Sequence, residues 1–134
     1  LREQGVVKAI GCGMNQWQML ADFARAGDFD VFLLAGRYTL LEQESLKDFL
    51  PLCSEKNIRI VIGGPYNSGI LATGAIEGAM YNYAPAPEPM LERVRGIEAV
   101  CGRHEVPQQA AALQFPFGHP AVATVIPSSR PIRW

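Results

Sequence analysis

Four short and nearly continuous apolar runs divide the chain: Val6–Ile10, Phe29–Ala35, Ile58–Ile62 and Val122–Ile126. Strands that are apolar on both faces are typical of parallel sheets covered by helices. The runs alternate with segments of helical periodicity, which predicts an α/β protein with right-handed crossovers. Two architectures fit, an open doubly wound sheet and part of a (β/α)8 barrel, and periodicity alone does not choose between them.

Apolar side chains recur at helical spacing between these runs. The expected helices contain Trp17–Ala24, Leu46–Cys53, Met90–Cys101 and Pro107–Phe115. A stretch rich in Gly, Pro, Ala and Tyr, from Tyr66 to Pro89, interrupts the alternation and is expected to be irregular.

The composition indicates one ordinary domain, residues 1–134, with enough apolar material for a core. Hydrophobic residues make up 49% of the sequence and charged residues 19%, so disorder is not expected. A net charge of −1 gives no indication of a nucleic-acid or anionic membrane partner. No apolar run approaches the ~20 residues that a membrane-spanning helix needs, and no signal-peptide pattern is present.

The residue types that bind metals or act as nucleophiles form no recognisable cluster. The cysteines fit neither a zinc spacing nor a disulfide framework, and we interpret them as reduced, mostly buried thiols of a cytoplasmic protein. They are Cys12, Cys53 and Cys101. His104 and His119 lie far from any carboxylate pair and are expected to be structural or solvated. Arg37 follows an apolar run and needs an anion, a carboxylate or water beside it.

Functional residues are expected beyond the carboxyl ends of the strands, where both architectures bind ligands. Gly63–Gly69 could form a nest of backbone amides for phosphate, or a flexible loop. Ser128, Ser129 and Arg130 suit phosphate recognition, or form a polar loop. Asn15 could offer its amide to a ligand, or cap the following helix. Neither a G-x-G-x-x-G motif nor a P-loop is present.

Four motifs occur in the order in which one enzyme family carries them. Val7–Gly11 is similar to the segment around that family's fifth strand, and Arg37–Leu41 to the aromatic-polar-Leu-Leu run after its sixth. Pro65–Leu71 with Gly74 resembles the loop after its seventh strand. The passage into its eighth strand is matched by Ala111–Gln114, His119-Pro120 and Val125–Pro127.

On these motifs the sequence resembles the aldo/keto reductases over nearly its whole length. Lys8–Asn15 and Gly63–Leu71 are most similar to the branch of sugar 1-dehydrogenases that act on L-fucose, D-threo-aldoses or galactose. The resemblance implies a parallel (β/α)8 TIM barrel of ~250 residues or more, of which this chain is the second half, strands five to eight. Leu1–Gly5, which resembles a helix end, and Pro131–Trp134, which follow a strand, lead us to expect a fragment of a longer protein.

The resemblance further implies hydride transfer between NADP or NAD and a sugar or aldehyde. The family's Asp, Tyr, Lys and His tetrad lies on earlier strands, so no catalytic residue is assigned and the chain alone is expected to be inactive. An aromatic stack under the nicotinamide is either missing or supplied by Tyr66. The family's sixth-strand Gln has no counterpart in Ala35-Gly36-Arg37. The expected cofactor contacts are Asn15 for the carboxamide, Gly64, Pro65, Tyr66, Ser68, Gly69 and Leu71 for the pyrophosphate, and Ser128, Ser129 and Arg130 for the adenosine side.

A different hypothesis is a non-catalytic half-barrel that binds a phosphate-bearing ligand or acts as an assembly module. In either case four strands of half a barrel would leave two open edges and a largely apolar interior face. We therefore expect self-association or pairing with the missing half-barrel.

Overall fold

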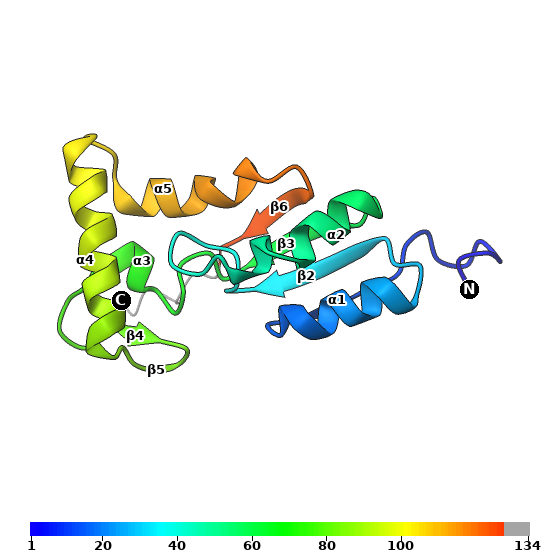
Figure 1. Cartoon of the computed structure of the whole chain (residues 1–134), viewed down its shortest axis with the longest axis horizontal. Helices are drawn as coiled ribbons and strands as arrows, with labels where there is room; N and C mark the ends of the chain where they lie inside the picture. Colours follow the sequence, from blue (N-terminus) through cyan, green and yellow to red (C-terminus); the bar gives the residue numbers. More distant parts are fainter. Residues whose placement is uncertain (128–134) are drawn as a thin grey trace, which may run out of the picture.

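The computed structural model describes residues 1–127 of the chain, and Figure 1 shows them as an α/β fold with a single main sheet. The strands of this sheet are β1 (Gly11–Met14), β2 (Val31–Ala35), β3 (Arg59–Gly63) and β6 (Val122–Ile126), and β4 (Met80–Tyr81) and β5 (Ala84–Pro85) form a separate hairpin. The helices are α1 (Trp17–Ala26), α2 (Phe49–Glu55), α3 (Ile70–Thr73), α4 (Glu88–Arg103) and α5 (Gln108–Gln114), with two short 3-10 turns at Glu44–Leu46 and Phe115–Gly118.

The main sheet is parallel, and its strands follow the order of the chain, β1-β2-β3-β6. A doubly wound sheet requires the strand order to reverse so that successive crossovers cover opposite faces. With sequential order and one handedness of crossover, the connecting helices fall on the same face. The described sheet therefore has the one-sided arrangement and not the doubly wound one.

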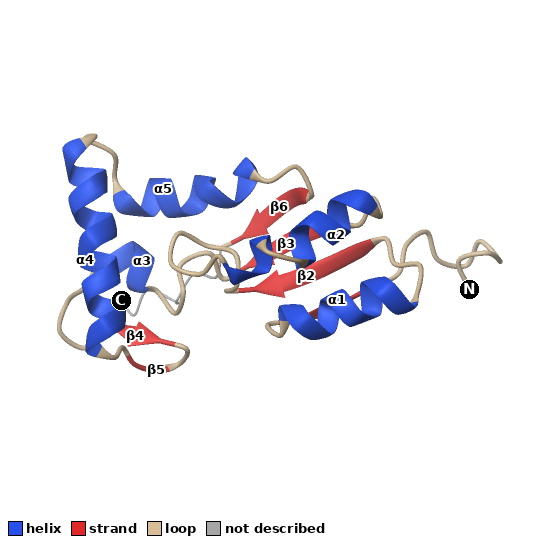
Figure 2. Cartoon of the chain, in the orientation of Figure 1, coloured by secondary structure: helices blue, strands red, loops and turns tan. Residues whose placement is uncertain are grey.

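The covered face of the sheet carries the main core. Leu20, Ala21 and Ala24 of α1 and Phe49, Leu50 and Cys53 of α2 pack there against alternate strand residues. Those strand residues are Phe32, Leu34, Ile60 and Ile62, all of them fully buried. In Figure 2 the two helices lie side by side on the sheet, and they contact each other as well. The period of two along the strands decides which side chains enter this core.

The opposite face of the sheet is open, and small side chains occupy much of it. Its residues are Gly11, Gly13, Val31, Leu33, Ala35, Arg59, Val61, Gly63, Thr124 and Ile126, and each of them is at least partly exposed. Leu33 lies between two glycines of the neighbouring strands, since a Cβ on Gly13 would come within 3.1 Å of its Cβ and one on Gly63 within 3.2 Å of its Cδ2. This open face is therefore less apolar than the four runs predicted.

A second core joins the helices that lie beyond the sheet. It contains Leu41, Ile70 and Leu71 of the region after β2 and β3, together with Val94 of α4 and Ala112 of α5. Figure 1 shows α4 and α5 at the end of the molecule opposite the N-terminal segment. None of the helices within residues 1–127 is long and apolar enough to cross a membrane.

The first predicted strand was placed wrongly. Val6 and Ile10 are exposed, and the strand is Gly11–Met14. A Cβ at Gly11 would lie only 1.9 Å from the carbonyl oxygen of Val31, so the close approach of β1 to β2 needs glycine there. Ile10 instead lies immediately before β1, and its backbone amide donates to the Asp30 carboxylate at 2.8 Å. This bond, followed by the ion pair of Asp30 with Arg2, lowers the pKa of Asp30.

The other predicted elements differ from the structure mainly at their bounds. The last apolar run coincides with β6, while the second and third strands are Val31–Ala35 and Arg59–Gly63. The expected helix from Leu46 to Cys53 is divided into a 3-10 turn and α2. The stretch expected to be irregular contains the one-turn helix α3 and the β4–β5 hairpin. Two-residue strands leave no periodicity that a sequence pattern could reveal.

Two adjacent leucines give a matched test of the one-sided sheet. Leu34→Ala is expected to lower the free energy of unfolding by about 2–5 kcal/mol, because it opens a cavity in a fully buried core. Leu33→Ala, on the open face, is expected to cost less than half as much. Urea unfolding of both variants and the wild-type chain measures the difference. Equal losses would show that the open face is covered and would contradict the description.

Candidate functional site

Two adjoining cavities lie beyond the carboxyl ends of β1, β2 and β3. The first, called here the strand-end pocket, has a volume of about 240 Å³. It is lined by Asn15, Ala35, Gly36, Arg37, Gly63, Gly64, Asn67, Ser68, Asn82 and Tyr83. The second, called here the Trp17 pocket, has a volume of about 380 Å³ and shares Asn15, Arg37 and Asn82 with the first. Ligands of parallel α/β folds bind at this end of the strands.

Asn67 ties the loop after β3 to the loop after β2. Its side-chain amide donates to the carbonyl oxygen of Gly36 at 3.0 Å, and its side-chain oxygen accepts from the Thr39 hydroxyl at 2.6 Å. The same Thr39 oxygen accepts the amides of Leu41 and Glu42. Both Thr39 and Asn67 are buried, so each of these bonds satisfies a polar group that water does not reach. Asn67 adopts a left-handed backbone, φ 46°, which asparagine tolerates better than most residues.

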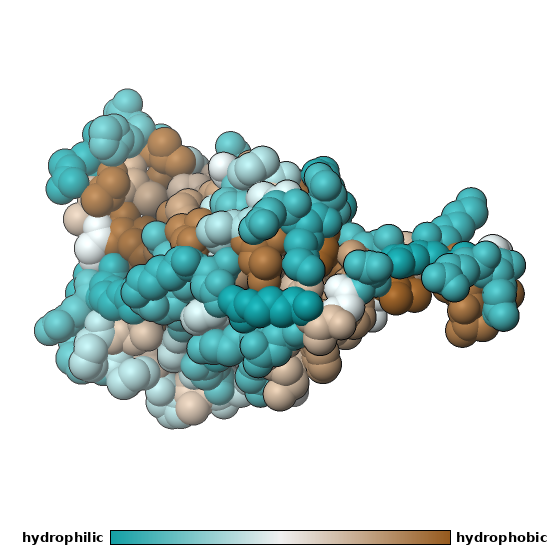
Figure 3. All heavy atoms as spheres, turned by 45° about the vertical axis from the view of Figure 1, so that its right-hand side comes forward, coloured by the Kyte–Doolittle hydropathy of each residue, from teal (hydrophilic) through white to brown (hydrophobic). Residues whose placement is uncertain are grey.

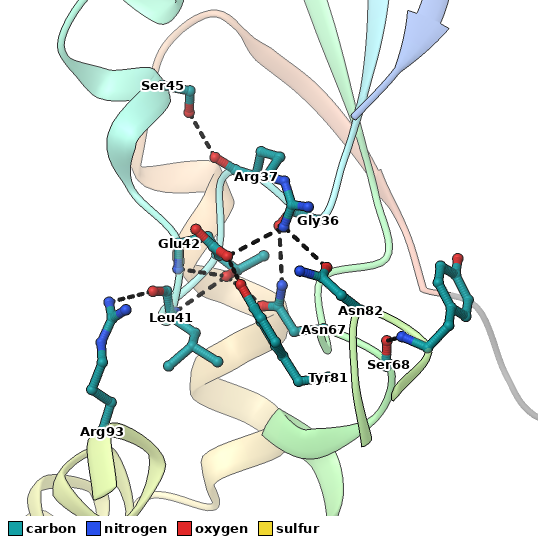
Figure 4. Close-up of polar contacts among 12 residues, drawn as sticks. Gly36, Arg37, Leu41, Glu42, Ser45, Asn67, Ser68, Tyr81, Asn82 and Arg93 are labelled. Atoms are coloured by element: carbon teal, nitrogen blue, oxygen red, sulfur yellow. Dashed lines mark hydrogen bonds and ion pairs between the residues drawn. The ribbon is translucent and has the colours of Figure 1, made fainter. Parts of the chain in front are cut away.

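Arg37 is the centre of a second polar network (Figure 4). Its guanidinium donates to Glu42 Oε1 and to Asn82 Oδ1, both at 3.2 Å, and the Tyr81 hydroxyl also donates to Glu42 Oε1. Of the partners expected for Arg37, which were an anion, a carboxylate or water, the structure shows a carboxylate, that of Glu42. Through Tyr81 and Asn82 the network fixes the β4–β5 hairpin beside the strand ends, so the hairpin forms a wall of both pockets.

The loop from Gly64 to Gly69 is held by hydrogen bonds within the loop and to β6 and the β4–β5 hairpin. The amides of Gly64, Asn67 and Gly69 donate to backbone carbonyls, and Ser68 Oγ accepts the amide of Tyr83 at 3.2 Å. Among the described residues, only the amides of Tyr66 and Ser68 in this loop have no such partner, and Pro65 has no amide hydrogen. Because most of its amides are engaged in these bonds, the loop offers an anion fewer donors than its composition suggested.

The structure brings together three of the residues predicted from the sequence and separates others. Asn15, Gly64 and Ser68 line one pocket. Pro65 and Leu71 are buried, and Tyr66 packs against the second core. None of these three residues lines the strand-end pocket. Gly69 precedes α3 with φ 99° and is absent from the pocket lining. Ser128, Ser129 and Arg130 lie outside the described residues.

Four lining or supporting residues were missed by the sequence-based prediction: Thr39, Glu42, Asn67 and Asn82. The signal for Asn67 was present, because an Asn-Ser pair before a glycine favours a left-handed turn. Asn82 lies 45 residues from Arg37, and only the folded hairpin brings the two together, whereas Glu42 lies five residues from Arg37 in the same loop. No sequence pattern of this chain predicts the contact between Arg37 and Asn82.

The remaining titratable groups fit structural roles. Burial raises the pKa of the Cys53 thiol to about 12, so it is an inert core side chain at neutral pH. Cys12 and Cys101 are half-buried, and all three cysteines are free thiols. His119 packs edge-on against Tyr38, and burial lowers its pKa. Within residues 1–127 no group of three His, Cys, Asp or Glu side chains is placed to hold a metal ion.

The lining of the strand-end pocket is polar. It has one guanidinium, three asparagine amides and the hydroxyls of Ser68 and Tyr83, and it contains no carboxylate. Asparagine amides match the donor and acceptor pattern of a carboxamide, while the charge of Arg37 is balanced by its ion pair with Glu42. Glycines at the ends of β2 and β3 leave space: a Cβ on Gly36 would stand 3.6 Å from Asn67 Nδ2, and both Gly36 and Gly64 have positive φ.

Comparisons with known proteins agree with the fold. The model of the aldo/keto reductase family matches residues 1–133. The chain is 42% identical to pyridoxal 4-dehydrogenase from Microbacterium luteolum over 94% of its own length and 37% of that protein. It is 41% identical to D-threo-aldose 1-dehydrogenase from a Pseudomonas species, over 98% of the chain and 40% of that protein.

Solved structures show the same fold. The holo form of an aldo-keto reductase from Bacillus halodurans superposes with a TM-score of 0.71 at 20% identity, over 96% of this chain and 42% of the other. A glycerol dehydrogenase from Gluconobacter oxydans gives a TM-score of 0.65 at 18% identity, over 98% of this chain and 43% of the other. The chain belongs to the aldo/keto reductase family, and it spans about two fifths of the length of the relatives that it matches.

Two residues with the same backbone strain test the role of Asn67. Asn67→Gly is expected to lower the free energy of unfolding by about 2 kcal/mol, because two buried hydrogen bonds of ~1 kcal/mol each are lost. Ser68→Gly, at φ 60°, removes only one exposed bond and is expected to change stability by less than about 1 kcal/mol. Both substitutions relax a left-handed backbone, so equal effects in denaturant unfolding would contradict the role of the Asn67 amide.

Proposed function

We propose that this chain is the cofactor-binding half of an NAD(P)-dependent oxidoreductase that transfers hydride between a nicotinamide and a sugar or aldehyde. The observation that carries the proposal is the carboxylate-free pocket at the ends of three parallel strands, in a chain of the aldo/keto reductase family. When bound, the nicotinamide would supply the hydride chemistry. The chain's own part is to bind and orient that cofactor, for which Asn15, Asn67 and Arg37 stand at the pocket wall.

The same proposal assigns the sheet to strands five to eight of a (β/α)8 barrel. Three features support it: the sequential order β1-β2-β3-β6, the core on one face, and the share of the relatives' length that the chain spans. In a barrel the open face would point to the interior, where layers of side chains from alternate strands fill the space. Leu33 flanked by Gly13 and Gly63 is the kind of alternation of large and small residues that such layers need.

The substrate class follows from the relatives. One is named for pyridoxal and the other for D-threo-aldoses, and each name describes an oxidation at an aldehyde-level carbon. We therefore propose an aldehyde, or the cyclic hemiacetal of a sugar such as L-fucose or galactose. The three free thiols suit a reducing compartment, and we place the protein in the cytoplasm on that ground.

The cofactor assignment is tested by binding. NADP and NAD are titrated against the chain by isothermal calorimetry, with Asn15→Ala as the pocket variant and Gln109→Ala, exposed on α5, as the control. Loss of the amide is expected to weaken binding about fivefold or more, and the control is expected to bind as the wild type does. Absence of binding by both nucleotides, or equal binding by both variants, would contradict the assignment.

The chain alone is expected to show no dehydrogenase turnover, since the resemblance assigns the groups that move the proton to strands outside it. Purified chain is incubated with L-fucose or galactose and NAD(P), and reduced cofactor is followed by absorbance. Oxidation that depends on the chain would refute this prediction. As a positive control, the chain is mixed with a second chain that carries strands one to four of a relative, and this mixture is expected to oxidise the sugar.

The exposed strand edges lead to an expectation about assembly. β1 and β6 are the edge strands of the main sheet, and the face between them is partly exposed. Unpaired backbone groups on such edges template pairing with another chain. We therefore expect the isolated chain to self-associate, or to pair with the missing half-barrel, at micromolar concentration in sedimentation velocity experiments. A stable monomer that binds no hydrophobic dye would contradict this expectation.

A further inference from the structure

The Trp17 pocket differs in charge from the strand-end pocket that it adjoins. Its lining contains two carboxylates, Glu42 and Glu44, and each is ion-paired, Glu42 with Arg37 and Glu44 with Lys47. Because the guanidinium of Arg37 is already balanced by Glu42, the lining disfavours phosphate and other anions, so this cavity is not a continuation of the proposed pyrophosphate site. Its other polar groups are side-chain amides and the hydroxyl of Tyr81, and this polar surface also disfavours an apolar ligand.

One wall of the cavity is aromatic. Trp17, the first residue of α1, is half-buried; it packs against the main core and also lines the pocket. The indole is therefore held by the core and offers a flat apolar surface beside polar groups. An indole face next to amides and carboxylates matches molecules that carry C–H groups on one side and hydroxyls around their edge.

The principal acceptor in the pocket is held in place before any ligand binds. Glu42 Oε1 accepts from Arg37 at 3.2 Å and from the Tyr81 hydroxyl, and the Glu42 side chain is only 18% exposed. Figure 4 shows Arg37, Tyr81 and Asn82 converging on this region from two loops. Oε2 of Glu42 has no partner among the described residues and is free to accept from a hydroxyl. A fixed charged acceptor gives stronger and more selective hydroxyl recognition than a mobile one.

We propose that the Trp17 pocket binds a neutral polyhydroxylated ring, that is, a sugar, beside the cofactor pocket. The indole of Trp17 covers the C–H face of the ring, while Glu42 accepts from its hydroxyls and the amides of Gln16 and Asn82 donate to them. The assignment of this sugar as substrate rests on the proposed function, whereas its binding does not. A cavity of about 380 Å³ is large enough for one monosaccharide.

The test uses Trp17 fluorescence. The chain has two tryptophans, so the Trp134→Phe variant leaves Trp17 as the only indole reporter. This variant is titrated with D-galactose, L-fucose, galacturonate as an anionic analogue and cyclohexanol as an apolar one. A saturable change with at least one neutral sugar is expected, with weaker binding of galacturonate because Arg37, the cation of the lining, is already paired with Glu42 and leaves the added carboxylate without a partner. Saturation by cyclohexanol at the same concentration, or no response to any neutral sugar, would overturn the proposal.

Substitutions locate the binding. Glu42→Gln keeps the shape of the side chain and is expected to weaken sugar binding by about tenfold, because a charged acceptor is replaced by a neutral one. Glu55→Gln, at the exposed end of α2, is the matched control and is expected to have no effect. Circular dichroism melting curves verify that each variant is folded. If folding of Glu42→Gln is impaired, Gln16→Ala, exposed at the pocket wall, replaces it with the same expected direction.

The outcomes separate this inference from the proposed function. Sugar binding that depends on Glu42, without any nucleotide binding, would support the sugar site and refute the cofactor assignment. Nucleotide binding that depends on Asn15, with no effect of Glu42→Gln on the Trp17 signal, would support the cofactor assignment and refute the sugar site.

Discussion

The packing of two helices on one face of a four-stranded parallel sheet is the interaction on which the rest of the structure depends. Phe32, Leu34, Ile60 and Ile62 project to the same side and meet α1 and α2 there. This common core sets the register in which β1, β2 and β3 end together, and their ends then place three loops within reach of one another. The polar site is a consequence of that alignment, because most of its residues lie at the last strand positions or in the loops that follow them.

The loops are held in place by polar contacts between side chains and backbone. Asn67 joins the loop after β3 to Gly36 and Thr39, and Arg37 joins the loop after β2 to the β4–β5 hairpin. The second core supports the same loops from behind with Leu41, Ile70 and Leu71. The hydrophobic surface over α4 and α5 in Figure 3 belongs to this distal part of the molecule, where Val100 and Val106 are exposed. The two pockets therefore have walls that are fixed in advance, which favours recognition of small polar ligands.

Sequence reasoning predicted the class of fold because hydrophobic burial has a period that can be read along the chain. Phe29–Ala35 and Val122–Ile126 contain the observed strands β2 and β6. It failed at Val6–Ile10, where apolar residues are exposed and a strand of Gly, Cys and Met follows, because close strand approach selected glycine over β-branched residues. The strand-end pocket lies where the sequence analysis expected functional residues, but only some of its lining residues were among those predicted. Asn15, Gly64 and Ser68 follow strand ends, whereas Asn82 is brought in by a tertiary contact that leaves no local pattern.

The central claim is that the carboxylate-free pocket at the strand ends accepts a nicotinamide cofactor. The most direct measurement is a titration of ¹⁵N-labelled chain with NADP, followed by NMR of the backbone and side-chain amides. The claim predicts that the largest shift changes fall on the Asn15 and Asn67 side-chain amides and on the backbone amides of Gly36 and Gly64. Changes confined to α4 and α5, or no changes at saturating nucleotide, would contradict it.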